Sequence, residues 1–131
     1  MNLYDRTLAA ESDVSTYRSA NIDEWIAAID PVLQAAGECA IGGDKVDDIT
    51  VSAKTLAIRT SYSVRCCAQT NDMSLPISIL EAENPIQAAT RYRVGRELAE
   101  AKAHLATTQR ALTEYTEKVA SLEAELAAVS V

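Results

Sequence analysis

Five arginines between positions 59 and 96 are the side chains in this sequence best suited to hold an anion. A guanidinium group has donors in a fixed fork and binds phosphate or carboxylate through two contacts at once. Two of these arginines share a segment of alternating polar and apolar residues, which predicts that both project from the polar face of one strand. The other three lie in a segment rich in helix-forming residues. The arginine set comprises Arg59, Arg65, Arg91, Arg93 and Arg96.

The arginine set predicts a site for a nucleotide or another small anionic ligand, at a subunit interface if the chain associates. Tyr92 lies among the helical arginines and offers a ring for stacking. Tyr62 falls on the apolar side of its strand and is expected in the core. The simpler alternative is that the arginines form surface ion pairs along the chain. The carboxylates that could form these ion pairs with the arginines are Asp72, Glu81, Glu83 and Glu97.

Signals for catalysis, for metal binding or for a cofactor are otherwise missing from the sequence. His104 is the only histidine, and no cysteine, aspartate or second histidine stands near it at metal-ligand spacing. Cys66–Cys67 lacks the two-residue spacer of a redox or zinc pair, so we expect small strand residues there. Gly42–Gly43 lacks the spacing of a phosphate-binding loop. We therefore expect no enzymatic activity, no metal and no cofactor.

The charge and the cysteines limit the classes of partner. The chain has 131 residues, with 12 lysines and arginines against 19 aspartates and glutamates, which gives a net charge of −7. Binding to nucleic acid in general depends on neutralising phosphates with basic side chains, so the acidic balance argues against it. No basic start followed by an apolar core indicates a signal peptide, and no apolar run reaches the roughly 20 residues that span a membrane. Together with an odd number of cysteines, three, these features predict a cytoplasmic protein without a membrane partner.

One long helix over Asn84–Val131 is expected to organise the rest of the chain. Asn84 is a favourable N-cap, Pro85 suits the first helical position, and Gln87 stands at the third position of a capping box. No proline follows in the segment. The sequence therefore predicts a small α+β body over residues 1–83 and a helical extension over residues 84–131.

Apolar residues in this helix recur every seven positions, as in a coiled coil. A seven-residue repeat held over five heptads implies a left-handed apolar seam against a partner helix. The a positions of the seam are Leu98, Leu105, Leu112, Val119 and Leu126. The d positions are Ala101, Thr108, Tyr115, Leu122 and Val129.

The length of the helix favours pairing with a second copy of the chain, as a dimer or a larger oligomer. At 1.5 Å per residue the helix reaches roughly 65–70 Å in length. A compact body made of the rest of the chain has a radius of gyration of only about 12 Å. Such a body is too small to cover the whole seam. The alternatives are a helix from another protein, or a break near Gly95 or Thr107–Thr108 that folds the helix back.

Charged residues beside the seam give a hint of orientation. In a parallel pair, Glu97 of one helix faces Lys102 of the other, and Lys118 faces Glu123. Each such pair contributes roughly a few tenths of a kcal/mol at an exposed site. Two pairs are too few to exclude an antiparallel arrangement.

The body is expected to begin with helices. Leu3, Tyr4 and Leu8 indicate a short first helix, and the serines and aspartate Ser12, Asp13, Ser15 and Ser19 indicate a break after it. Asn21 is expected to cap a second helix, which Gly37 ends. Pro31 should kink this helix or restart it with Asp30 as a new cap. Its apolar stripe comprises Ile22, Trp25, Ile26, Ile29, Val32 and Leu33.

A change to period two after Gly42–Gly43 predicts three antiparallel strands in a meander. The first strand is short and contains Ile49 and Val51. A polar turn at Gln69–Asp72 is expected to separate the second strand from the third. The second strand alternates Leu56, Ile58, Tyr62, Val64 and Cys66 with Thr55, Arg59, Ser61, Ser63 and Arg65, and the third carries Leu75, Ile77 and Ile79 around Pro76. Because Pro76 has no N–H to donate, the third strand is expected at an edge.

Three classes of function fit these features. The first is a non-enzymatic, self-associating protein that occupies or sequesters a partner, as small accessory inhibitors of viruses and mobile elements do; this class rests on analogy. The second is a sponge for a nucleotide or another small anion, built on the arginine set at a subunit interface. The third is an assembly component that uses its long helix as a docking rod.

Overall fold

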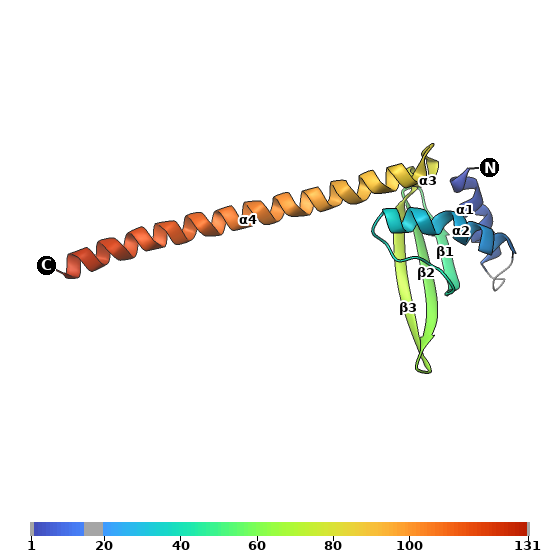
Figure 1. Ribbon diagram of the computed structural model, residues 1–131, viewed down its shortest axis with the longest axis horizontal. Helices are drawn as coiled ribbons and strands as arrows, with labels where there is room; N and C mark the ends of the chain where they lie inside the picture. The colour runs from blue at the N-terminus through green and yellow to red at the C-terminus, as the bar shows by residue number, and fades with distance from the viewer. Residues whose placement is uncertain (1, 15–19, 131) are drawn as a thin grey trace. The chain divides into compact units, whose positions relative to one another are not determined.

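The computed structural model describes residues 2–14 and 20–130 and shows the expected α+β fold (Figure 1). The elements in chain order are α1 (Leu3–Asp13), α2 (Ala20–Ala35), β1 (Lys45–Val51), β2 (Thr55–Val64), β3 (Cys67–Pro76), α3 (Ile77–Glu81) and α4 (Pro85–Val129). The chain divides into two compact units, Met1–Arg93 and Val94–Val131, so the boundary falls inside α4. We call the first unit the body and the second the rod.

The three strands form the predicted antiparallel meander in the order β1-β2-β3. The pairing of β1 with β2 begins with Lys45 opposite Ser61, whereas β2 and β3 pair along their whole length up to the turn at Arg65–Cys66. The hairpin of β2 and β3 therefore continues past the end of β1 as a ribbon of two strands (Figure 1). We call this ribbon, Tyr62–Gln69, the arm.

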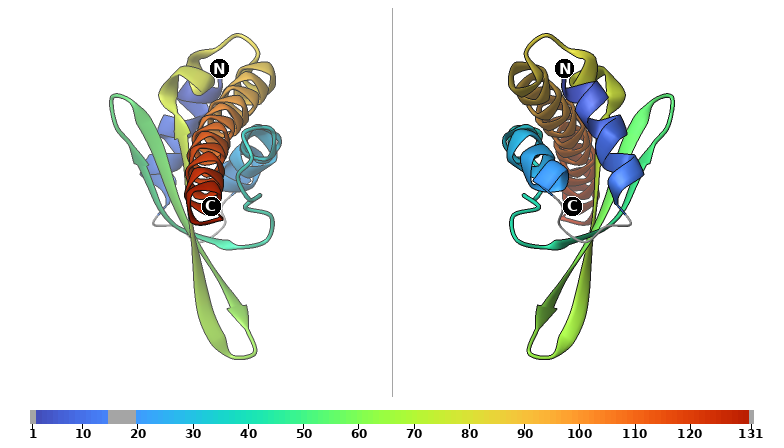
Figure 2. Two further views of the ribbon diagram at one scale, coloured as in Figure 1. Left: turned by 90° about the vertical axis from the view of Figure 1, so that its left-hand side faces the viewer. Right: turned by 90° about the vertical axis from the view of Figure 1, so that its right-hand side faces the viewer.

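The core of the body lies between one face of the sheet and the helices α1 and α2, which occupy that same face (Figure 2). The apolar stripe predicted for the second helix is buried throughout. From the strands, the core receives the side chains that alternate inward. These are Val46, Ile49, Leu56, Ile58, Thr60, Met73 and Leu75.

A buried hydrogen-bonded chain joins α1 to α2. The indole Nε1 of Trp25 donates to the hydroxyl oxygen of Thr7 over 3.0 Å, and that hydroxyl donates to the carbonyl oxygen of Leu3 over 2.8 Å. Trp25 is only 2% exposed and Thr7 is fully buried. The pairing leaves neither polar group without a partner in the core, where an unmade hydrogen bond costs roughly 1–3 kcal/mol.

The second helix differs from its prediction at two places. It begins at Ala20 rather than after a cap at Asn21, and it continues through Pro31 without restarting. The carboxylate of Asp30 does not cap a new helix; it accepts hydrogen bonds from the backbone N–H groups of Ile41 and Gly42, at 2.7 and 3.0 Å. Asp30 thus anchors the loop that leads to β1.

The end of α2 and the first helix agree with the sequence. Gly37 has φ +85°, and its N–H donates to the Gln34 carbonyl oxygen while the N–H of Glu38 donates to that of Leu33. This pair of bonds is the Schellman arrangement, which needs a left-handed residue and so favours glycine. The short first helix is present as α1. Ser12 and Asp13, predicted to break the chain after it, lie inside this helix, and Ser15 and Ser19 lie outside the described residues.

The predicted boundaries of the second and third strands were wrong. The turn lies at Arg65–Cys66 instead of at Gln69–Asp72, and these last four residues belong to β3. Arg65 and Cys66 have φ +50° and +66°, the left-handed conformation of a two-residue hairpin turn. This turn is seldom built without glycine, asparagine or aspartate, and for that reason the sequence favours a turn in the polar run at Gln69–Asp72.

The third strand ends at Pro76, and the residues predicted to continue it form α3. Ile77, Ile79 and Leu80 are all buried. Alternating isoleucines suggested a strand, but the short helix places the adjacent Leu80 in the core as well. β3 remains an edge strand, as Pro76 indicated.

The start of α4 agrees with its prediction. The side-chain oxygen of Asn84 accepts a hydrogen bond from the N–H of Gln87 over 3.2 Å, and Pro85 is the first helical residue. Ala89 is the only buried residue of this helix in the part of the chain that the structure describes. The first turns of α4 therefore belong to the body, and Val131, the predicted last residue, lies outside the described residues.

Candidate functional site

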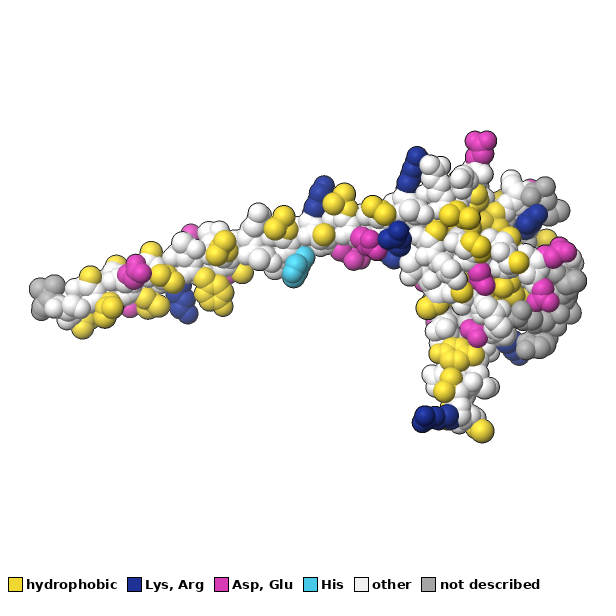
Figure 3. Space-filling model, in the orientation of Figure 1, with side chains coloured by type: hydrophobic (Ala, Val, Ile, Leu, Met, Phe, Trp, Pro, Cys, Tyr) yellow, Lys and Arg dark blue, Asp and Glu magenta, His cyan; other side chains and the backbone are white. Residues whose placement is uncertain are grey.

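The predicted seam residues of α4 are all exposed in the single chain. The larger ones, from Leu98 to Val129, leave between 52% and 83% of their surface accessible. Figure 3 shows apolar side chains following the helix along the rod. A stripe of this length in contact with water is unfavourable, since burying one leucine side chain contributes roughly 1.5–3 kcal/mol.

The threonines of the rod already use their hydroxyl groups within the helix. Thr108, in the predicted seam, donates to the carbonyl oxygen of His104 over 3.0 Å. Thr107, Thr113 and Thr116 make the same bond to the carbonyl four residues earlier. Because its donor is satisfied within the helix, Thr108 can face an apolar side chain at a much lower desolvation cost than a free hydroxyl.

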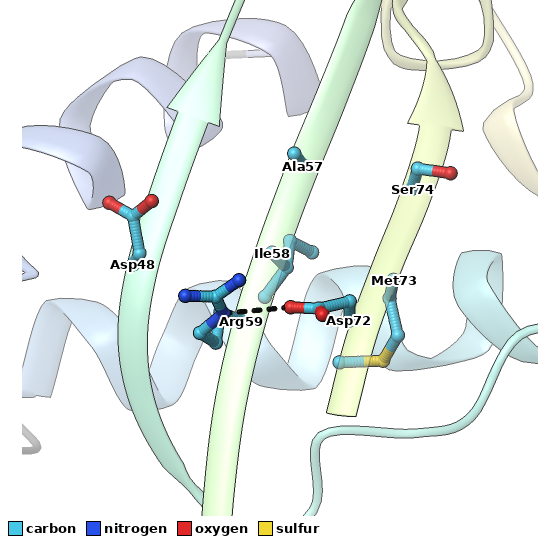
Figure 4. Close-up of a pocket in the computed structure, with 7 residues that line it drawn as sticks. All are labelled: Asp48, Ala57, Ile58, Arg59, Asp72, Met73 and Ser74. Carbon is cyan, nitrogen blue, oxygen red and sulfur yellow. Dashed lines mark hydrogen bonds and ion pairs between the residues drawn. The ribbon is translucent and has the colours of Figure 1, made fainter. Parts of the chain in front are cut away.

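Arg59 lies on the open face of the sheet, opposite to the helices (Figure 4). Its Nε donates to a carboxylate oxygen of Asp72 on β3 over 2.9 Å. This hydrogen bond and the negative charge of Asp72 raise the pKa of Arg59. Asp48 of β1 stands on the other side of the guanidinium, and the residues lining this shallow pocket are Asp48, Ala57, Ile58, Arg59, Asp72, Met73 and Ser74.

The alternation of polar and apolar residues predicts Arg65 on the same strand face as Arg59, and this prediction is wrong. It stands in the turn at the tip of the arm and is exposed. The backbone there is left-handed, so the period of two no longer sets the direction of the side chain. The expected pair of strand arginines is therefore not formed on one surface.

The helical arginines have separate surroundings. Arg93 is half-buried, and its Nε donates to the carbonyl oxygen of Ala35, the last residue of α2, over 3.1 Å. Arg91 is exposed and lines a pocket with the loop before α4. Tyr92 is 38% exposed, and Arg96 is an exposed residue of the rod.

Taken residue by residue, the arginine set is distributed over the sheet face, the hairpin turn and α4. Two of its members make hydrogen bonds within the body: Arg59 binds Asp72, and Arg93 binds the end of α2. The ligand-binding role of the set stays a prediction. Binding of a nucleotide probe that is lost in an Arg59→Ala or Arg91→Ala variant, with association unchanged, is the result that would support it.

The arm exposes an apolar surface, although the sequence predicts that its residue Tyr62 lies in the core. Tyr62 and Val64 continue the inward face of β2, yet they are 36% and 46% exposed because the ribbon extends beyond the end of β1. Cys66 and Cys67 at its tip are also exposed. Alternation in the sequence gave the correct face of the strand, but it carries no information about where the covering helices end.

Within residues 2–14 and 20–130, no three histidine, cysteine, aspartate or glutamate side chains gather as a metal ion requires. In that same part of the chain, no helix combines the length and the apolar character needed to cross a membrane.

Comparison with models of protein families, with curated proteins and with solved structures gives no match to this chain. A functional proposal therefore rests on the residues and their geometry.

Proposed function

We propose that this chain is a non-enzymatic binding protein that self-associates through the rod and occupies or sequesters a partner in that associated form. The single observation that supports the proposal is the exposed heptad seam of α4. The body has a core of its own buried apolar side chains, whereas the seam residues of the rod are exposed and need a partner to be buried.

The energetics of the rod support association. Among the described residues of the rod, none is buried in the single chain, so the helix gains little there from the packing of apolar side chains. Helices in proteins draw most of their stability from packing of an apolar face. A second helix on the seam supplies that packing, and the seven-residue spacing keeps the seam facing the partner over its whole length.

A second copy is the partner that accounts for the seam most directly. The seam is long and uniform in spacing, and every copy of the chain carries the same one, so each molecule brings its own complement. The charged residues beside it include both signs, which permits attraction between copies. A foreign helix as partner, the docking-rod alternative, is separated by the experiment below.

The test compares the solution mass of the intact chain with that of a seam variant, by light scattering over a wide range of concentration. The variant Leu105→Glu/Leu112→Glu places two charges in the seam. The control Ala106→Glu/Thr113→Glu places the same two charges one residue further along, about 100° around the helix and away from the seam. Both control positions are exposed.

We expect the intact chain and the control to form a dimer or a larger oligomer and the seam variant to be monomeric. An intact chain that is monomeric at every concentration contradicts self-association and leaves the docking rod. Association that survives the two seam charges places the interface elsewhere and also contradicts the proposal.

A further inference from the structure

The sizes of the seam residues differ along α4, and this difference distinguishes the two directions in which a second copy can pair. We propose that the rods of two copies pair antiparallel, with Leu98 of one copy opposite Val129 of the other. The inference rests on the proposed self-association and adds the direction and the register of the pair.

A parallel pair in register places each residue opposite its own copy. Ala101 then faces Ala101 and Thr108 faces Thr108, which gives two thin layers close together. Tyr115 faces Tyr115 in the next d layer, which is overfilled. Protein interiors are packed to nearly uniform density, and both a void and an excess of volume destabilise them.

An antiparallel pair with full overlap matches a small side chain to a large one in each uneven layer, because a positions then face d positions. Ala101 meets Leu126, and Thr108 meets Val119. Tyr115 meets Leu112 instead of a second tyrosine ring. The full set of layers is Leu98–Val129, Ala101–Leu126, Leu105–Leu122, Thr108–Val119 and Leu112–Tyr115, each occurring twice.

The hydroxyl of Thr108 fits this arrangement. It faces Val119, which offers no hydrogen-bond acceptor in its side chain, but its donor is already bound to the carbonyl oxygen of His104 over 3.0 Å. The layer therefore buries the methyl group of Thr108 against valine without leaving the hydroxyl proton unpaired.

The charged residues beside the seam select the register. In an antiparallel pair, e positions face e positions and g positions face g positions. With Leu98 opposite Val129, Lys102 faces Glu123, which is an attractive pair, and His104 faces Glu125, so no like charges face each other.

A shift of one heptad reverses this balance. Moving the pair so that Leu98 lies opposite Leu122 brings Glu97 to Glu125 and places Lys102 opposite the uncharged Thr116. Like charges that face each other are destabilising. The shift also removes the last d residue from contact with the seam, so charge and buried area favour the same register.

Charge alone does not decide the direction, since the parallel pair also has two attractive contacts. The direction follows from packing: a layer of two alanines or two threonines leaves a void, and a void in a core is destabilising. In the antiparallel pair no layer is made of two small or two very large residues.

The arrangement separates the two bodies. With Leu98 opposite Val129, the two Arg93 residues lie on the order of 60 Å apart along the paired helices, at 1.5 Å per residue. Each end of the dimer then presents one body. Such a dimer joins two partner molecules at a fixed spacing, whereas a parallel dimer presents both bodies at one end.

The test uses single cysteines in the full-length chain. The exposed native cysteines Cys39, Cys66 and Cys67 are first replaced by serine. One variant then carries Ala101→Cys and a second carries Leu126→Cys. Oxidised glutathione is the oxidant: two protein thiols lose their protons and two electrons and form one disulfide, and the glutathione disulfide is reduced to two thiols.

When the two variants are mixed and oxidised, we expect a covalent dimer that contains one chain of each, identified by intact mass. The Ala101→Cys variant alone should form no more covalent dimer than the cysteine-free chain. Circular dichroism on each variant confirms that the helix is retained.

Three results contradict the inference in distinguishable ways. A covalent dimer from Ala101→Cys alone shows parallel pairing, with self-association intact. A dimer in light scattering without a disulfide in the mixture shows another direction or register. A cysteine-free chain and an intact chain that are both monomeric remove the proposed function itself, together with the inference that rests on it.

Discussion

The body and the rod contain the same kinds of aliphatic residue but differ in what covers them. In the body, Ile29, Leu33 and Leu56 are fully buried by other parts of the same chain. In the rod, Leu105 and Leu112 are 56% and 67% exposed. Both regions have apolar residues at regular spacing, so the period alone does not distinguish a helix that packs on its own body from one that requires a second molecule.

What separates the two regions is the number of neighbouring elements. The apolar faces that form the core of the body have other elements within a short length of chain: α1 packs on α2 and β1, and β2 pairs with strands on both sides. The rod has one element only. Its stability should therefore depend on protein concentration, whereas that of the body should not.

The largest effect is expected from a truncation in the core of the body. Leu33→Ala removes a fully buried side chain, which should lower the free energy of unfolding by roughly 2–5 kcal/mol. Urea titration followed by the fluorescence of Trp25, the only tryptophan, measures this loss.

The matched control is Leu112→Ala, the same truncation in the rod. It should weaken association and leave the Trp25 transition unchanged, since Leu112 is 67% exposed in the single chain and is not a member of the core. If both variants shift the Trp25 transition equally, the body and the rod do not differ in the way described.

A smaller effect is expected at the junction between the regions. Asn84→Ala removes the oxygen that accepts the Gln87 N–H, and a lost N-cap costs about 1 kcal/mol. Thermal unfolding measured by circular dichroism should show the decrease. Asn84→Ser retains an oxygen at the cap and should restore most of the stability; equal losses in the two variants would mean that the cap contributes nothing.

The smallest effect is expected at the tip of the arm, and it has the opposite sign. Cys66 has φ +66°, which costs a residue with a side chain roughly 1–2 kcal/mol, while glycine adds about 0.5–1 kcal/mol of unfolded-state entropy. Cys66→Gly should therefore stabilise the body by about 0.5 kcal/mol in urea titration. Cys67→Gly, in a strand, should give no gain; a gain at Cys67 or a loss at Cys66 would contradict the turn geometry.

The sequence predicted those parts of the fold that depend on local signals. The cap at Asn84, the end of α2 at Gly37, the stripe around Trp25 and the three-stranded meander were all found. Each relies on residues within one or two turns of each other, or on a regular period. The physical causes of these features are contained in the segment itself.

The parts that could not be predicted depend on contacts distant in sequence or on an unusual backbone. Pro31 breaks helices in isolation, but here α2 continues while Asp30 binds the loop at Ile41 and Gly42. The turn at Arg65–Cys66 uses residues that disfavour its conformation. The exposure of Tyr62 depends on where β1 stops, which no residue near Tyr62 encodes.

The candidate sites show the same division. The residues of the seam can be predicted from their spacing alone, although burial of the seam by a partner is a proposal. The positions of the arginines cannot be predicted in this way, because Arg93 is held by the carbonyl group of Ala35, 58 residues earlier. The type of a residue alone therefore does not show whether it binds an anion, because its neighbours in the fold determine whether it is already paired.

The inclusion of the first turns of α4 in the body bears on how the long helix forms. Starting a helix is unfavourable because several residues must be ordered for the first hydrogen bond, whereas each further residue adds a bond at little cost. Here the Asn84 cap, the buried Ala89 and the bond from Arg93 to α2 order those turns when the body folds. The body thus acts as a template for nucleation, and the rod has only to elongate from it.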